Sequence, residues 1–398
     1  MLSFTMRSRQ ITLPIAIALS CAGLTNVGVG NAQTWTATGA PVTNWTSLAV
    51  SADGSKLFAA ANNAQGTTGE LFLSIDFGVS WTQTLVTNLS WISVASSADG
   101  NWLAAAPTSG VSYLSTNAGT TWATNISSTK WTKIVSSADG SKLAATRFLS
   151  GVFVSTNAGG IWSTSVAPIF DVTCIASSAD GTKFAAGNNV GRMANSTNGG
   201  ASWSTNAPLP MYVGCIASSA DGTRLLAGVG GPGAPSGSLY TSRNSGLSWV
   251  SNSAPSHFWN SVAMSADGNT LLAVTGFSIY TSTDGGANWV SNNTPHLDWS
   301  SAAMSADGAK MFATASPGGI YILQNTPAPR LAITPSNGDL AFSWTVPSTN
   351  FVLQESLDLT GTNWVTLTNL PALNLRNLQD ELNVPAQGAA GYFRLITQ

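Results

Sequence analysis

Short apolar runs alternate with polar turns along most of the chain, and the arrangement repeats. In its first copy, apolar runs at 45–50 and 56–60 flank the sequence Ser51-Ala52-Asp53-Gly54, and a third run follows at 71–73. Asp-Gly between two apolar runs is typical of a β-hairpin, so each copy predicts two paired strands with a third beside them. This Ser-Ala-Asp-Gly turn, called the SADG turn below, occurs seven times, starting at Ser51, Ser97, Ser137, Ser178, Ser219, Ser265 and Ser305.

A second motif, Ser-x-Asp/Asn-x-Gly-x-x-Trp, follows the third run, and we call it the box. Its six copies begin at Ser74, Ser115, Ser155, Ser196, Ser242 and Ser282 and end at Trp81, Trp122, Trp162, Trp203, Trp249 and Trp289. The side-chain oxygen of its third residue suits an Asx-turn and its Gly suits a positive φ, so the box predicts a tight turn into a fourth strand. The third residues are Asp76, Asn117, Asn157, Asn198, Asn244 and Asp284. Because four of them are amides, which are poor calcium ligands, we expect all six to be structural.

The strand count indicates how the array ends. A period of about 40 residues with four short strands per repeat is that of a β-propeller blade. Seven copies of the first three strands are present, but no box follows the last third strand at 319–323. The segment 34–41 matches 248–255, so it can supply the missing outer strand and leave no free edge. We therefore predict an all-β chain with a seven-bladed β-propeller over 33–323, built of four-stranded antiparallel blades and closed by its N-terminal strand.

The box closely resembles the Asp-box, or bacterial neuraminidase (BNR) repeat, of β-propellers such as sialidases, xyloglucan hydrolases, sortilin-type receptors and photosystem II assembly factors. The resemblance covers residues 34 to about 323. It implies the propeller fold, with the boxes in peripheral turns away from the ligand face. It does not imply one function, because the same fold carries several. A WD-type propeller fits the period equally well, but the Gly-His and Trp-Asp signatures of that class are absent.

The two ends of the chain differ from the repeats. Residues 1–32 read as a signal peptide, with Arg7 and Arg9 before an apolar run at 11–24 and a small-x-small cleavage site at 30–32; a lipidated Cys21 is the alternative. A Pro-rich linker at 324–329 leads to 330–398, which we expect to form a small β-sandwich. That segment is similar to fibronectin-III-like modules of exported Verrucomicrobia-type proteins, which implies a role in attachment or spacing. No other stretch is long and apolar enough to span a membrane.

Charge and cysteine content narrow the function further. Removing 1–32 takes two of the 15 Lys+Arg and none of the 17 Asp+Glu, leaving 13 against 17, so a basic nucleic-acid footprint is absent. Charged residues make up only 8% of the chain, which suits an exported protein rather than a cytosolic enzyme. Cys174 and Cys215 occupy equivalent positions in successive repeats. They are either a disulfide formed in an oxidising compartment or two buried thiols.

The ligand face is expected opposite the boxes, around the loops that lead into the innermost strands. Equivalent positions there are Trp45, Trp91, Trp131, Val172, Val213, Trp259 and Trp299, preceded by Asn44, Ser90, Lys130, Asp171, Tyr212, Phe258 and Asp298. The Trp residues either pack between blades or form a platform for a sugar or peptide. The ligand-binding candidates are Trp45, Trp91, Trp131, Asp171, Tyr212, Trp259, Asp298 and Trp299.

Candidates for catalysis are few. Glycoside cleavage needs two carboxylates beside the bond, and outside its turns the propeller has Glu70, Asp171 and Asp298. The sialidase set of three Arg, a Tyr/Glu pair and Arg-Ile-Pro does not match the four Arg of the propeller, one of which lies inside a box. The two histidines, His257 and His296, lack metal-ligand spacing, so we predict neither metal nor cofactor.

These observations lead to one functional expectation and one rival. We expect an exported, monomeric, non-catalytic binding or scaffold propeller that recognises a glycan or protein partner of the cell envelope or exterior. The alternative is a secreted glycoside hydrolase that uses Asp171 and Asp298.

Overall fold

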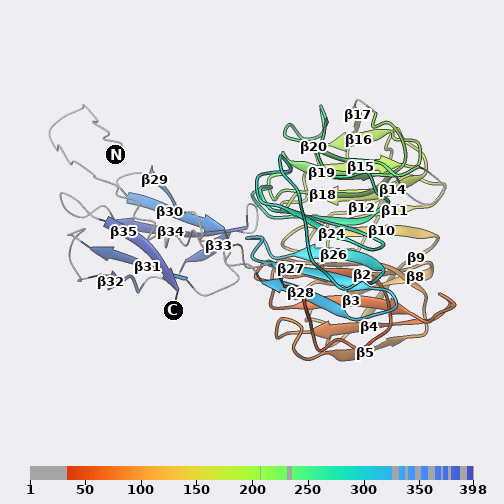
Figure 1. Cartoon of the computed structure of the whole chain (residues 1–398), viewed down its shortest axis with the longest axis horizontal. Coiled ribbons are helices and arrows are strands. Elements are labelled where there is room, and N and C mark those ends of the chain that lie inside the picture. Colours follow the sequence, from red (N-terminus) through yellow and green to blue (C-terminus); the bar gives the residue numbers. More distant parts are fainter. Residues whose placement is uncertain are drawn as a thin grey trace. The chain divides into compact units, whose positions relative to one another are not determined.

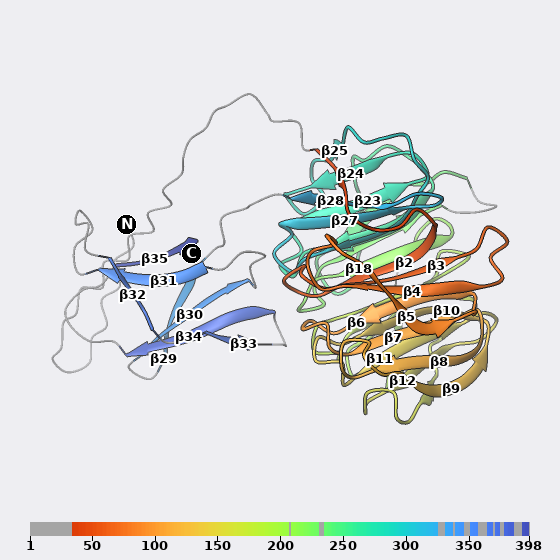
Figure 2. The ribbon, with the colours of Figure 1, turned by 90° about the horizontal axis from the view of Figure 1, so that it is seen from below.

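The secondary structure is entirely β in the part of the chain that the computed structural model describes. Those residues are 34–397, without 207, 231–234, 325–330, 337–338, 346–350, 357–363, 369–370, 375–377 and 386–391. The chain divides into a larger compact unit over 32–327 and a smaller one within 328–398 (Figures 1 and 2). The predicted signal peptide, the alternative at Cys21 and most of the predicted linker lie outside the described residues. No described helix is long and apolar enough to cross a bilayer.

The larger unit contains seven antiparallel sheets of four strands each, which confirms the predicted seven-bladed propeller. Blade 1 is β2 (Asn44–Val50), β3 (Leu57–Asn62), β4 (Gly69–Ser74) and β5 (Thr82–Thr87). Blade 2 is β6 (Trp91–Ser96), β7 (Leu103–Pro107), β8 (Ser109–Ser115) and β9 (Ala123–Thr129). Blade 3 is β10 (Trp131–Ser136), β11 (Leu143–Arg147), β12 (Val152–Ser155) and β13 (Ser163–Ser165). Blade 4 is β14 (Val172–Ser177), β15 (Phe184–Asn188), β16 (Met193–Ser196) and β17 (Ser204–Thr205).

The remaining blades follow the same order. Blade 5 is β18 (Val213–Ser218), β19 (Leu225–Val229), β20 (Leu239–Ser242) and β21 (Val250–Ser251). Blade 6 is β22 (Trp259–Met264), β23 (Leu271–Thr275), β24 (Ile279–Ser282) and β25 (Val290–Ser291). Blade 7 is β26 (Trp299–Met304), β27 (Lys310–Ala315), β28 (Ile320–Gln324) and the N-terminal β1 (Thr36–Ala37). The strand named first in each blade is its innermost strand, and in blade 7 that strand is β26.

The N-terminal strand closes the ring as the sequence predicts. Thr36 pairs with Ile322 and Ala37 with Tyr321 in an antiparallel register. Trp35 is 5% exposed and lies in the core cluster shared by blades 6 and 7, with its ring centroid 6.4 Å from that of Trp299. Trp35 thus fills the place that a box Trp fills in the other blades.

Apolar side chains fill the interfaces between blades. Between blades 1 and 2, for example, Phe58 and Leu71 pack against Trp91 and Leu103, and Trp122 of the next box lies 5.5 Å from the Phe58 ring. Because both faces of each sheet are covered, the second strands are almost entirely apolar and rich in small residues. In β3, β7, β15, β19, β23 and β27 every residue, or all but one, is buried.

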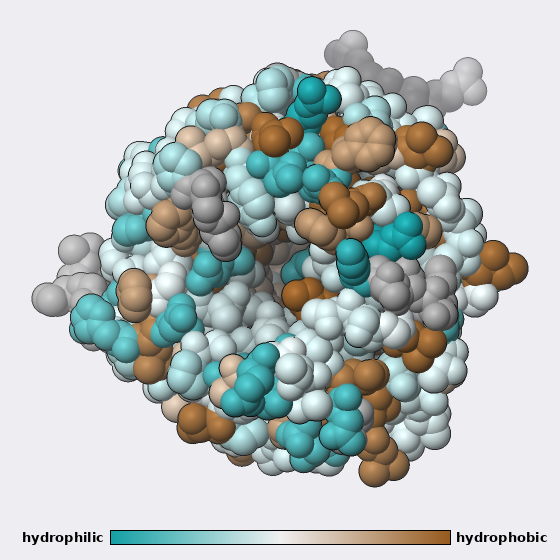
Figure 3. Space-filling view, turned by 90° about the vertical axis from the view of Figure 1, so that its right-hand side faces the viewer, coloured by the Kyte–Doolittle hydropathy of each residue, from teal (hydrophilic) through white to brown (hydrophobic). Residues whose placement is uncertain are grey.

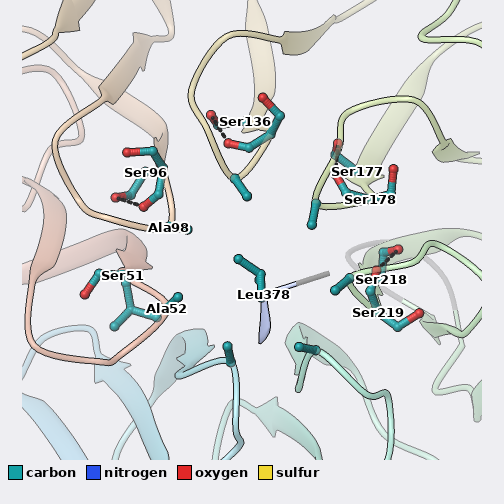
Figure 4. A pocket seen from close by; sticks show the side chains of 18 of the residues that line it. Ser51, Ala52, Ser96, Ala98, Ser136, Ser177, Ser178, Ser218, Ser219 and Leu378 are labelled. Atoms are coloured by element: carbon teal, nitrogen blue, oxygen red, sulfur yellow. Dashed lines mark hydrogen bonds between the residues drawn. The ribbon is translucent and has the colours of Figure 1, made fainter. Parts of the chain in front are cut away.

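The SADG turns form a continuous ring around the axis, which the sequence did not predict. Within one turn the Ser51 hydroxyl donates to Asp53 at 2.6 Å and accepts the Lys56 N–H at 2.9 Å. The alanine N–H of each turn donates to the alanine carbonyl of the next blade at 2.7–2.9 Å, in the order Ala52, Ala98, Ala138, Ala179, Ala220, Ala266, Ala306 and back to Ala52. Figure 4 shows these turns around a central cavity of about 180 Å³, lined mostly by serine and alanine.

The smaller unit is a sandwich of two sheets. One sheet has the order β29 (Ala332–Ser336), β30 (Asp339–Thr345), β34 (Gln379–Pro385) and β33 (Ala372–Asn374). The other has the order β32 (Val365–Thr366), β31 (Phe351–Ser356) and β35 (Tyr392–Thr397). Both contribute to one core that includes Phe342, Trp344, Leu353 and Leu382.

Candidate functional site

The propeller has two different faces because consecutive strands of a blade run in opposite directions. The SADG turns and the boxes lie on one face. The other, which we call the loop face, carries the loops into the innermost strands and the hairpins between second and third strands. Figure 3 shows one face of the propeller in space-filling form, with a hollow at its centre and with hydrophilic and hydrophobic side chains mixed around it.

The six box side chains hold their own turns. In the last box Asp284 accepts the Ser282 hydroxyl at 2.8 Å, the Asn288 N–H at 2.9 Å and the Asn288 amide at 2.7 Å. These bonds, led by the backbone N–H of Asn288, lower the pKa of Asp284 to about 2. In the other five, Asp76, Asn117, Asn157, Asn198 and Asn244 each accept the hydroxyl of the first box serine at 2.8–3.0 Å. No group of three metal-ligating side chains occurs among the described residues.

The five tryptophans that begin innermost strands are buried between blades. Trp45, Trp91, Trp131, Trp259 and Trp299 are each at most 3% exposed. Trp45, for example, packs against Phe312 and Ile320 of blade 7, and its Nε1 donates to the Gly318 carbonyl at 3.0 Å. Of the two interpretations from sequence, the structure matches packing between blades. Indoles buried in this way do not form a platform for a surface ligand, so the five are removed from the candidate site.

A β-bulge near the start of every innermost strand, directly after the Trp or Val at its mouth, sets these directions. The pairing register shifts there in all seven blades. In several blades the bulged residue donates to the next blade, as Thr173 does to the Val213 carbonyl at 2.6 Å and Ser300 to the Trp45 carbonyl at 2.9 Å. A bulge turns consecutive side chains away from strict alternation. After Trp131, Trp259 and Trp299 the following polar residue, Thr132, Asn260 or Ser300, therefore ties its blade to the next one.

Cys174 and Cys215 are free thiols, so the disulfide alternative is not what the structure shows. The Cys174 Sγ lies 3.4 Å from the Val213 carbonyl oxygen, and the Cys215 Sγ lies 3.6 Å from that of Trp259. Each thiol thus points to the innermost strand of the next blade, and the two do not face each other. Burial raises the pKa of Cys174 to about 12 and also raises the pKa of Cys215, so both are neutral at physiological pH.

The two acidic candidates occupy separate loops. Asp171 leads into blade 4, where its Oδ2 accepts the Asn189 amide at 3.3 Å, and its Oδ1 is buried with no hydrogen-bond partner. Asp298 leads into blade 7, is exposed, and holds the Ser316 N–H through its backbone carbonyl at 2.8 Å. The fold places them three blades apart, each beside the hairpin of its own blade.

The cations of the propeller are unevenly placed. Lys56, Lys142 and Lys183 donate to the Asp carbonyl of the next SADG turn, Arg224 donates to Asn269 nearby, and Lys310 lies over the Phe77 ring. Arg243 lies inside a box. The remaining four belong to the loop-face parts of blades 3 and 4. They are Lys130, Lys133, Arg147 and Arg192.

Exposed apolar side chains accompany these four cations. We call the combined surface the basic patch and define it by Lys130, Lys133, Arg147, Phe148, Leu149, Phe170, Val190 and Arg192. Phe170 is 81% exposed, Leu149 63%, Val190 62% and Phe148 50%. Exposed apolar residues also occur in box turns, such as Ile161 and Leu247, and on the loop face of blade 6, where Phe258 is 50% and Phe277 71% exposed; blade 6, however, contributes no cation. Sequence reasoning named Lys130 only as one member of a ring and missed the patch, because its residues come from loops that are distant along the chain.

Hydrogen bonds and core contacts make the patch continuous. The Phe148 N–H donates to the Lys130 carbonyl at 2.9 Å, and the Lys130 ammonium lies 5.8 Å from the centre of the Phe148 ring. Ile169, next to Phe170, is buried against Val152 in the interface of blades 3 and 4. The Asn188 amide then donates to the Phe170 carbonyl at 3.0 Å. The two hairpins and the two loops are therefore fixed to one another.

The same region concentrates backbone strain. Lys130, Leu149 and Asp171 have φ of 66°, 56° and 53°. Apart from the residues inside boxes, Asn88 is the only other described non-glycine residue of the propeller with positive φ. Such conformations each cost on the order of 1 kcal/mol and persist where the surroundings impose them, often at functional sites. Here they present Lys130 and Leu149 outward.

Lys133 extends the patch into the centre of the ring. It is the only charged residue in the seven innermost strands, and the equivalent residues are Ser47, Ser93, Cys174, Cys215, Ser261 and Ser301. Burial lowers the pKa of its ammonium, and the titratable groups near enough to act on it are the thiols of Cys215 and Cys174.

Tyr212, a candidate from sequence, precedes the innermost strand of blade 5, is half-buried, and accepts the Gly230 N–H through its backbone carbonyl at 2.8 Å. Burial raises the pKa of its phenol, and the same two thiols act on it. Comparison of equivalent strand positions would have singled out Lys133, since every other blade has a small uncharged residue there.

Comparisons with known proteins concern the fold. No family model matches the chain, and no curated protein matches it. Among solved structures, YCF48 bound to D1 peptide is similar with a TM-score of 0.57 at 15% identity, over 75% of this chain and 96% of that one. YCF48 from Cyanidioschyzon merolae has a TM-score of 0.58 at 14% identity, over 73% and 98%. The Cps50 (Swd1) β-propeller domain of Myceliophteria thermophila has a TM-score of 0.58 at 15% identity, over 74% and all of that chain. At these identities the likeness shows a β-propeller fold.

Proposed function

We propose that this chain is an exported, non-catalytic binding propeller that takes a segment of a protein partner on its loop face, over blades 3 and 4. The observation that carries the proposal is the basic patch. Phe148, Leu149, Phe170 and Val190 expose apolar side chains beside four cations, in hairpins and loops that hydrogen bonds hold in place. Exposed apolar groups rimmed by polar ones are characteristic of protein-binding sites.

The structural neighbours support a peptide ligand. YCF48, which shares the propeller fold, has been solved bound to D1 peptide. A glycan was the equal alternative from sequence, and the indole platform expected for either ligand is buried here. The exposed aromatic residues that remain are phenylalanines on loops, which suit apolar side chains of a partner.

A hydrolase remains the rival proposal, and the unpartnered Oδ1 of Asp171 is the observation that favours it. A glycosidase needs its two carboxyl groups on either side of one bond, roughly 5–10 Å apart. Asp171 and Asp298 belong to blades 4 and 7, beside different hairpins. We therefore propose that the chain turns over no glycoside.

The test compares the purified chain with two single variants on arrays of peptides and of oligosaccharides. Phe170→Ser removes an exposed side chain from the patch, and Ile161→Ser removes one of similar exposure, 73%, from a box turn. We expect peptide binding that Phe170→Ser weakens and Ile161→Ser does not. Hydrolysis of an oligosaccharide that Asp171→Asn or Asp298→Asn abolishes would overturn the proposal in favour of the rival.

A further inference from the structure

Charge on the loop face is separated by blade. Blades 3 and 4 hold all four of its cations and one carboxylate, Asp171, while Glu70 and Asp298 lie at blades 1 and 7. The whole chain has a formal net charge of −2, so the positive region is local. A local field of this kind attracts an anionic partner and orients it as it arrives.

Among the residues of the basic patch, Lys133 is the one whose charge would be stabilised most by a bound anion. Its ammonium has no hydrogen bond or ion pair to any described residue, and both neighbouring thiols are neutral. Lys133 is half-buried, and a partly desolvated cation without a partner costs free energy. Packing does not require a lysine at this position, because serine fills it in four other blades.

From these observations we propose that the loop face binds an acidic peptide segment, one carboxylate of which pairs with Lys133 in the central space while apolar neighbours contact Phe148 and Phe170. This inference rests on the proposed function and specifies its ligand. Lys133 supplies three N–H donors as a compact charge, and a carboxylate accepts such bonds in charge-assisted form.

The exposed phenylalanines decide between a peptide and other anions. A free phosphate or a sugar acid would use the lysine but leave Phe148 and Phe170 in water. A peptide has acidic and apolar side chains at adjacent positions. Extended across the joined hairpins of blades 3 and 4, it reaches both the ammonium and the rings.

The test is a set of ten-residue fluorescent peptides, in which one central Glu lies between Leu and Phe residues, and a matching set with Gln in place of that Glu. Binding is followed by anisotropy with the full chain, Lys133→Ser, Phe170→Ser and Arg243→Ser. Serine is native to the Lys133 position in other blades, and the melting temperature of each variant verifies its fold. Arg243→Ser makes the same charge change in a box, away from the patch.

We expect Lys133→Ser to lower the affinity for the best Glu peptide by about tenfold, because a hydrogen bond between charged groups is lost. The affinity for the matching Gln peptide should be unchanged. Phe170→Ser should weaken both peptides equally, and Arg243→Ser neither. If Phe170→Ser weakens binding but Lys133→Ser affects Glu and Gln peptides alike, the ligand assignment is overturned and the proposed function stands. If no peptide binds and an acidic oligosaccharide binds in a Lys133-dependent way, both the peptide assignment and the proposed function are overturned.

Discussion

The backbone N–H of Ala306 donates to the carbonyl oxygen of Ala52 at 2.7 Å and so completes the ring of seven SADG turns. This bond joins blade 7 to blade 1 at the axis. The pairing of Thr36 with Ile322 completes blade 7 at the rim. The propeller is therefore closed twice, by backbone contacts that do not depend on each other. Such closure gives the loops of blades 3 and 4 a rigid support.

The outer closure should depend strongly on Trp35. Trp35→Ala removes a large side chain from the core of blades 6 and 7, so we expect a loss of about 3 kcal/mol of unfolding free energy. Urea unfolding followed by circular dichroism measures it. Val42→Ala, at a residue 81% exposed, is the control and should change little. Equal stability of Trp35→Ala and the parent chain would contradict closure by the N-terminal strand.

The buried serines of the SADG turns should contribute more to the stability of the fold than exposed serines of the boxes do. The hydroxyl of Ser305 donates to Asp307 at 2.6 Å and accepts the Lys310 N–H at 2.9 Å, and the residue is fully buried. Ser305→Ala should cost about 2 kcal/mol, because a buried N–H loses its partner. Ser248→Ala, at an exposed hydroxyl that accepts one bond from Asn244, should cost no more than about 0.5 kcal/mol. Similar costs at the two sites would show that the turn ring contributes little.

Acid should destabilise the propeller through its turn carboxylates. Burial alone would raise the pKa of Asp267, but the Ser265 hydroxyl and the Asn269 N–H and amide donate to the carboxylate, and its net pKa is lowered. The pKa of Asp284 is lowered to about 2. A carboxyl group whose pKa is lower in the folded chain than its unfolded value near 3.9 stabilises the fold at pH values above about 3.9. This stabilisation is lost as the pH falls through the folded-state pKa. The melting temperature should therefore fall steeply between about pH 4 and pH 2.

Asp284→Asn isolates one such group. Four natural boxes already carry Asn with the same serine bond, so this variant should keep its stability at pH 7. It should also lose less stability than the parent chain on acidification. A large loss at pH 7, or an unchanged acid profile, would contradict the role assigned to the box carboxylate.

Lys133 should reduce stability in the absence of ligand. Its folded-state pKa is lowered from the usual 10.5, so the unfolded chain binds more protons between the two values and stability rises with pH across that interval. Lys133→Ser should melt at a higher temperature than the parent chain at pH 7, and the difference should shrink as pH approaches 10.5. A lower melting temperature for Lys133→Ser at pH 7 would mean that the lysine has a stabilising partner.

The thiols should be insensitive to reductant. Because Cys174 and Cys215 point to different neighbouring strands, dithiothreitol should leave the melting temperature unchanged. Alkylation by iodoacetamide should be slow until the chain unfolds, since both thiols are buried and neutral. A reductant-dependent melting temperature would indicate a disulfide.

The repeats explain which features could be predicted from sequence. Strand number, the box turns and closure by 34–41 follow from local patterns that recur, and each pattern has one structural solution. The burial of Trp45 and its equivalents could not be predicted, because it depends on which way each of these side chains points. The bulge after it breaks the alternation from which that direction is inferred. The same uncertainty applied to Cys174 and Cys215.

The basic patch could not be predicted because it is made by the ring and not by any repeat. Lys130, Phe148, Phe170 and Arg192 each look like ordinary loop residues in the sequence. They lie on one surface because Phe148 bonds to Lys130, Asn188 bonds to Phe170, and Ile169 packs against Val152 between the two blades. Lys133 could have been found from the sequence, because it is the one charged residue among equivalent positions of the innermost strands. Finding it requires the seven strands to be aligned with one another.

The most direct test of the account is amide hydrogen exchange of the chain, read by mass spectrometry, with and without a saturating amount of the best-binding acidic peptide. Binding on the loop face predicts slower exchange in the hairpin at 147–151, the loop at 166–171 and the hairpin at 188–192. It predicts no change in the box turns at 155–162 and 196–203, which belong to the same blades but lie on the opposite face. Protection of those box turns, with the hairpins unchanged, would contradict the assignment of the binding site to the loop face.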